Sequence, residues 1–64
     1  MMREICLTDK MRDKTTKFEG KVTAIARYLT GPNRILLENV DNTGRPIEWW
    51  YDEDRLEFVY KEED

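Results

Sequence analysis

The sequence contains no histidine and only one cysteine, Cys6, among its 64 residues. The lack of histidine removes the most common general base near neutral pH and the most common metal ligand. A single cysteine excludes an intrachain disulfide and a multi-cysteine zinc site, and it is typical of a reducing compartment such as a bacterial cytoplasm. We expect Cys6 to be a small apolar strand residue without a chemical role.

Long apolar runs are also missing. No segment approaches the roughly 20 residues of a membrane-spanning helix, and the charged start Met-Met-Arg-Glu does not resemble a signal peptide. We therefore expect a protein that is neither exported nor inserted into a membrane. The acidic run 52–54 is the nearest approach to a catalytic cluster. Without histidine or a glycine-rich phosphate loop it predicts a solvated turn, and we expect no enzyme, no metal and no cofactor.

The size and charge of the chain limit its possible roles. We assign residues 1–61 to one small domain and 62–64 to an acidic tail; a domain of this size buries only roughly 60% of its unfolded surface. The net charge is −3, made of +4 over residues 1–37 (eight basic, four acidic) and −7 over 38–64 (three basic, ten acidic). This acidity argues against affinity for duplex DNA.

The pattern of apolar residues and turns predicts an all-β fold. Strands are expected near Leu7–Met11 and over 21–29, 34–40, 47–51 and 56–60, with polar turns between the first four and one helical turn at 52–55, capped by its aspartates. Asp13 falls in the first polar turn, where Phe18 follows as an apolar anchor. Five short strands with one helical turn before the last are typical of a small, partly open barrel.

Residues 21–29 form the longest predicted strand. A helix is the competing interpretation, but flanking glycines and the Val, Thr, Ile and Tyr content favour a strand. Alternation would direct Val22, Ala24, Ala26 and Tyr28 to the core. The opposite face would carry Lys21, Thr23, Ile25, Arg27 and Leu29.

Two stretches resemble a family of very small proteins of tailed bacteriophages and prophages. Residues 9–31, DKMRDKTTKFEGKVTAIARYLTG, are similar to a family pattern DKVxDKVTGFEGxxTAxAxYLxGC, and residues 50–57, WYDEDRLE, are similar to an ending WFDExxLE. The resemblance covers residues 9–59 and implies an SH3-like barrel encoded by a phage and acting in the cytoplasm of its bacterial host. Most family members have no known function, so the resemblance implies the fold rather than the activity.

The sequence departs from the family pattern at two positions. The glycine before the phenylalanine is Lys17 here, which suggests that this turn does not need a left-handed residue. The cysteine after the second glycine is Pro32, so no role of that cysteine can be carried over.

Aromatic residues are the main sign of function. Alternation places Trp49 and Tyr51 on one face of their strand and Trp50 on the other, and so small a barrel cannot bury both faces. Either Trp50 lies in the core and the other two are exposed, or the reverse. Arginine and lysine near such a surface would suit a nucleotide, because guanidinium groups bind phosphate and aromatic rings stack on bases. The candidate ligand-binding residues are Lys21, Arg27, Tyr28, Arg34, Trp49 and Tyr51.

Two functions fit these features nearly equally. One is an anti-defence protein that sequesters a cyclic di- or trinucleotide immune signal of the host, with a pocket that could form between subunits of a homo-oligomer. The other is an interaction module that docks an aromatic face or an edge strand on a host protein. A minor virion component and a binder of single-stranded nucleic acid are further alternatives.

Overall fold

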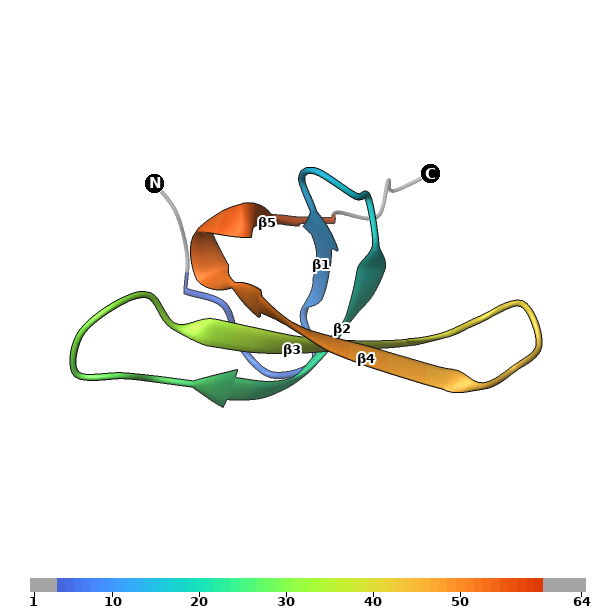
Figure 1. The fold of residues 1–64 in the computed structure, drawn as a ribbon, viewed down its shortest axis with the longest axis horizontal. Helices are drawn as coiled ribbons and strands as arrows, with labels where there is room; N and C mark the ends of the chain where they lie inside the picture. The colour runs from blue at the N-terminus through green and yellow to red at the C-terminus, as the bar shows by residue number, and fades with distance from the viewer. Residues whose placement is uncertain (1–3, 60–64) are drawn as a thin grey trace.

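The computed structural model describes residues 4–59, which form one antiparallel sheet (Figure 1). Along the sheet the strand order is β4-β3-β2-β1-β5. The elements are β1 (Lys10–Asp13), β2 (Glu19–Ala26), β3 (Arg34–Val40), β4 (Pro46–Asp52), the 3-10 turn η1 (Glu53–Arg55) and β5 (Leu56–Phe58). The all-β fold of five strands, with one helical turn before the last, is as the sequence predicts. The outer strands β4 and β5 do not pair, so the sheet is not closed into a barrel.

Strand β2 belongs to both halves of the sheet. Its first residues pair with β1, and from Lys21 onward it pairs with β3. The long β3–β4 hairpin therefore lies on one side of the molecule, with β1, β5 and η1 on the other (Figure 1). Gly20 lies at the bend, where an added Cβ would be 2.8 Å from the Glu38 carbonyl oxygen. Glycine is thus the residue that lets the two strands approach so closely.

A β-bulge between Val22 and Ala24 reverses the predicted alternation of β2. Val22 is buried opposite Leu37, but beyond the bulge Ile25 packs against the core opposite Ile35. Ala24 consequently lies on the opposite face from Val22, because the extra residue shifts the pleat by one position. The prediction that Val22, Ala24, Ala26 and Tyr28 share the core face is therefore wrong beyond Val22.

The core consists of side chains from every strand except β4, together with the segment before β1. Among the described residues the buried apolar side chains are Ile5, Met11, Val22, Ile35, Leu37 and Leu56. Phe18, Ile25, Tyr51 and Phe58 pack against them and are partly exposed. Phe18 is thus the loop anchor that the sequence predicts.

The ends of the predicted strands differ from those observed. Leu7 is exposed in a turn and β1 begins at Lys10, so the first strand lies later than expected. Cys6 is exposed and precedes this turn, and it is not a strand residue. Strand β2 ends at Ala26, which leaves Tyr28 in the following loop. Tyr60 and the tail 62–64 lie outside the described residues.

The β3–β4 hairpin closes on a three-residue loop. The Asp41 N–H donates to the Arg45 carbonyl (2.9 Å), and the Asp41 carboxylate accepts hydrogen bonds from the Thr43 hydroxyl (2.7 Å) and backbone N–H (2.8 Å). Gly44 has a φ of +89°, the left-handed position that such loops reserve for glycine. These side-chain bonds, the Thr43 hydroxyl first, lower the pKa of Asp41.

The β1–β2 turn also requires a left-handed residue, and that residue is Lys17. Its φ is +69°, and its N–H donates to the Asp13 carbonyl (2.9 Å). The expectation that this turn would not need a left-handed residue is therefore wrong. A side chain with a Cβ atom is strained in this conformation.

Replacing Lys17 with glycine should stabilise the fold by about 1 kcal/mol, because strain at the left-handed position is removed. For a domain of this size the midpoint of thermal unfolding should rise by about 4–8 °C, measurable by circular dichroism. Lys17→Ala is the matched control, since it removes the same charge but keeps the Cβ atom. Equal midpoints for the two variants would contradict the role of backbone strain.

Candidate functional site

The outer face of the β2–β3–β4 sheet, which lies away from the core, carries one apolar row. In this row Ala24, Leu36 and Trp50 lie side by side across the three strands. Two positions along the strands, on the same face, the next row contains Arg34 and Asp52, whose side chains form an ion pair (Nε–Oδ1 3.4 Å). Trp50 is 43% exposed and Leu36 is partly buried, so this row is accessible to a partner.

A shallow hollow of about 400 Å³ lies over this row. We call it the outer hollow; it is lined by Arg34, Leu36, Glu48, Trp49 and Trp50. Two of the predicted ligand-binding residues, Arg34 and Trp49, therefore come together here. The hollow is amphipathic, with an apolar floor between a cation and a carboxylate.

Both tryptophans are exposed, and they lie on opposite faces of β4. Trp49 is opposite the buried Leu37 and so belongs to the core-side face, but it is 66% exposed because the hairpin extends past the core. Tyr51, on the same face, packs against the core. Neither of the two predicted arrangements is therefore correct, because neither tryptophan is buried and Tyr51 does not share the exposure of Trp49.

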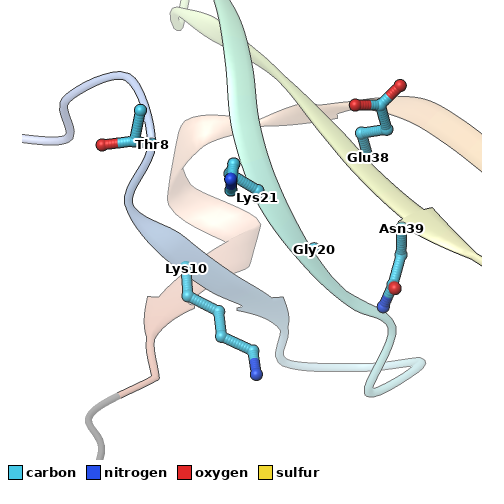
Figure 2. Close-up of a pocket in the computed structure, with 6 residues that line it drawn as sticks. All are labelled: Thr8, Lys10, Gly20, Lys21, Glu38 and Asn39. Carbon is cyan, nitrogen blue, oxygen red and sulfur yellow. The ribbon is translucent and has the colours of Figure 1, made fainter.

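Lys21 lies in a different hollow, of about 320 Å³, shown in Figure 2. It is lined by Thr8, Lys10, Gly20, Lys21, Glu38 and Asn39. Lys21 lies directly opposite Lys10 on β1 and opposite Glu38 on β3. The hollow thus presents charges of both signs on an open surface.

Arg27 and Tyr28 lie beyond the end of β2 and away from both hollows. The Arg27 guanidinium pairs with the Glu4 carboxylate (3.5 Å), and Tyr28 is 55% exposed. The predicted shared face of Lys21 and Arg27 does not exist, because the bulge lies between them and β2 ends first. The six predicted residues are accordingly spread over several parts of the surface.

A buried carboxylate anchors the strand that carries the tryptophans. The Asp13 side chain is fully buried, and the Arg55 guanidinium binds both of its oxygens, at 3.1 Å through Nε and 2.9 Å through Nη2. The same guanidinium lies 5.7 Å from the centre of the Tyr51 ring, which in turn stacks on Phe18 (6.0 Å). These contacts connect β1, η1 and β4, and the contact of Arg55 with the Tyr51 ring is a cation–π interaction.

Further bonds complete the anchor around η1. The Asp13 carboxylate also accepts hydrogen bonds from the Thr16 hydroxyl (2.6 Å) and N–H (2.8 Å). Asn33 holds the start of η1, because its carbonyl accepts from the Glu53 N–H and its side-chain amide donates to the Glu53 carboxylate (both 2.9 Å). Asp52 occupies the N-cap position without a capping bond, so the predicted aspartate cap is wrong.

The hydrogen bonds that Asp13 accepts lower its pKa, the Thr16 hydroxyl contributing most and Arg55 less. A second cross-strand group acts in the same direction on Glu57. The Arg12 Nε on β1 donates to the Glu57 carboxylate on β5 (2.8 Å) and its Nη1 lies 3.4 Å from Glu19 on β2. This hydrogen bond, donated by Arg12 and accepted by Glu57, lowers the pKa of Glu57 and raises the pKa of Arg12.

Two residues that make the outer hollow apolar, Leu36 and Trp50, are not among the predicted ligand-binding residues. Side-chain alternation indicates Trp50 only as the alternative to Trp49 and Tyr51. The register of β3 against β4 could have supplied the missing signal, since Asp41 to Arg45 defines the hairpin turn and hence the Leu36–Trp50 pair.

Metal sites, membrane helices and comparisons with known proteins do not identify a function. Within residues 4–59 no group of three acidic or cysteine side chains is placed to hold a metal ion. No helix in this part of the chain is long and apolar enough to cross a membrane. No family model, curated protein or solved structure matches this chain. The phage family resemblance therefore stays a prediction.

We expect the fold to lose stability in acid. The pKa of Asp13, Glu57 and Asp41 is lower in the folded chain than in the unfolded chain, so their stabilising effect is complete above the unfolded pKa of about 4 and disappears as the pH falls through the lower, folded values. The thermal unfolding midpoint should vary little between about pH 6 and about pH 8, and it should decrease when the pH is lowered below about 4.

Replacing Asp13 with asparagine tests the main contributor to this acid response. Asp13→Asn should lower the midpoint at neutral pH by about 5–10 °C, because the amide nitrogen cannot accept the hydrogen bonds that one carboxylate oxygen accepts, and it should flatten the decrease in acid. Asp54→Asn is the control, since it replaces an exposed carboxylate in η1 and should change the midpoint little. An equally steep acid decrease in Asp13→Asn would contradict this assignment.

Proposed function

We propose that this chain is a non-enzymatic binding protein that docks a partner protein on the outer hollow. The observation that carries the proposal is the exposed Trp50, set beside Leu36 in an apolar row between charged rows. Tryptophan in such a setting is the side chain most often found at the centre of a protein interface, and a polar rim usually surrounds it. The mixed charges of the rim suit a protein surface.

A protein partner fits the outer hollow better than a free nucleotide does. Arg34 is its cation, and this side chain already pairs with Asp52. Glu48 adds a carboxylate to the same lining and would repel phosphate. Lys21 and Arg27, which would supply further positive charge, lie elsewhere on the surface.

A cyclic nucleotide stays the second candidate, because one observation favours it. Arg34 and Trp50 line one hollow, and a guanidinium beside an aromatic ring can bind a phosphate while the ring stacks on a base. The phage resemblance supplies the biological setting for either candidate: a host protein that the chain inhibits, or a host signal that it sequesters.

Trp50→Ala should abolish capture of the partner protein. Immobilised wild-type chain, incubated with a bacterial host lysate, should retain one protein in stoichiometric amount, and Trp50→Ala should lose it because the centre of the interface is removed. Tyr28→Ala is the matched control, since it removes an exposed aromatic ring that lies outside the hollow. In the purified complex, hydrogen exchange should slow across 34–37 and 48–51.

Titration calorimetry with a panel of cyclic di- and trinucleotides separates the two candidates. We expect no heat from any of them. Binding of one nucleotide that Trp50→Ala removes and Tyr28→Ala keeps would replace the protein-docking proposal with nucleotide sequestration. Retention of the captured protein by Trp50→Ala would show that the outer hollow is not the docking surface.

A further inference from the structure

Strand β4 is an outer strand whose free edge has a defined set of hydrogen-bonding groups. The Asp41 N–H donates to the Arg45 carbonyl, so the pair beside the loop is hydrogen-bonded and the next residue along β4, Pro46, is in a non-hydrogen-bonded pair. Proline fits there, because it has no N–H to lose and its nitrogen points away from β3. By the same alternation, the outward-pointing backbone groups belong to Glu48, Trp50 and Asp52.

This edge has no strand partner among the described residues, although it carries both exposed tryptophans. A seven-residue edge strand with free N–H and C=O groups is a template for another strand. Natural edges are usually protected by charged side chains, by proline, by a bulge or by a covering segment. On β4 the protecting features are Pro46 at one end and the carboxylates of Glu48 and Asp52, of which Asp52 is already paired with Arg34. The chemistry of the strand itself indicates what pairs with it.

We propose that β4 pairs antiparallel with β4 of a second copy of this chain, with the two-fold axis at Trp49. In this register Glu48 faces Trp50 of the second copy, and Trp50 faces Glu48, so both pairs exchange backbone hydrogen bonds. The Asp52 N–H of one copy would also donate to the Pro46 carbonyl of the other. Proline has no N–H but keeps this carbonyl acceptor. Two copies would thus form one continuous antiparallel sheet.

Charge favours this register over its neighbours, although the sheet itself contains two like-charge pairs, Lys10 opposite Lys21 and Glu38 opposite Glu48. Residues whose backbone groups point away from β3 must pair with residues of the same kind in the second copy. The registers nearest to the proposed one therefore have the axis at Glu48 or at Trp50. The first would place Glu48 directly opposite Glu48, and the second would place it opposite Asp52. Like charges directly opposite each other destabilise a sheet. The axis at Trp49 is the one of these three without such a pair.

The side chains on the core-side face are complementary in the same register. Ile47, Trp49 and Tyr51 lie along this face of β4. The two Trp49 rings would meet at the axis in a non-hydrogen-bonded pair, where side chains are closest, and each Ile47 would face Tyr51 of the other copy. Trp49, the more exposed of the two tryptophans, is thereby covered.

The dimer and the proposed partner docking share Trp49, which also lines the outer hollow, but they are read out differently: the dimer by mass in solution, with its axis at Trp49, and docking by partner capture, with its centre at Trp50. Both outer hollows would lie on the same side of the continuous sheet. The two ideas therefore fail separately in experiment.

The first test is the mass of the protein in solution. Light scattering after size exclusion should give twice the mass of one chain for the wild type. Trp49→Lys should raise the dissociation constant at least about 100-fold, since two lysines would meet at the axis. Trp50→Lys is the matched control and should keep the dimer, because the new lysine faces Glu48. Circular dichroism verifies that each variant folds.

The second test fixes the register by cross-linking. In a Cys6→Ser background, Trp49→Cys should form a disulfide-linked dimer with oxidised glutathione, because the axis brings the two Cβ atoms within disulfide reach. Trp50→Cys, which faces Glu48, should stay monomeric on a denaturing gel. A wild type with the mass of one chain, or cross-linking through position 50 instead of 49, would overturn the proposal.

Discussion

The pairing of the buried Asp13 carboxylate with the half-exposed Arg55 guanidinium is the interaction on which the rest of the structure depends. A carboxylate without solvent contact is tolerated only when cations and donors surround it, and here a two-pronged guanidinium and Thr16 do so. The pair connects the end of β1 to the turn before β5. Through the Tyr51 ring beside the guanidinium it also holds β4, the second strand of the long hairpin.

The small core explains why both exposed tryptophans lie on the hairpin. The buried apolar residues are enough to cover one side of β3 near Ile35 and Leu37, but not the part of the hairpin that extends beyond them. Trp49 is exposed for this reason although it lies on the core-side face. Within residues 4–59 no second layer covers the outer face of the neighbouring strands, which leaves Trp50 accessible. The proposed binding role therefore rests on the geometry of one edge strand rather than on an enclosed cavity.

Local residue patterns predict much of this fold but few of its long-range contacts. The strands 34–40 and 47–51 could be recognised because turn residues flank apolar runs, and the observed strands agree to within a residue. The prediction for β2 failed because a bulge depends on which strands pair on either side of it, and no single strand encodes that. The prediction for the turn at Lys17 was wrong for a related reason. Hydrogen bonds between β1 and β2 impose a left-handed conformation there, which lysine does not favour.

The sequence by itself determined the all-β class, the number of strands, the helical turn and the excess of aromatic residues on the fourth strand. Those features arise from side-chain alternation and turn chemistry, which act over a few neighbouring residues. Only the tertiary structure decided that Asp13 is buried, that Arg34 lies beside Trp50 while Lys21 and Arg27 do not, and that β4 is an outer strand. These depend on register and strand order, because contacts between residues far apart in the chain are set by how the whole sheet packs.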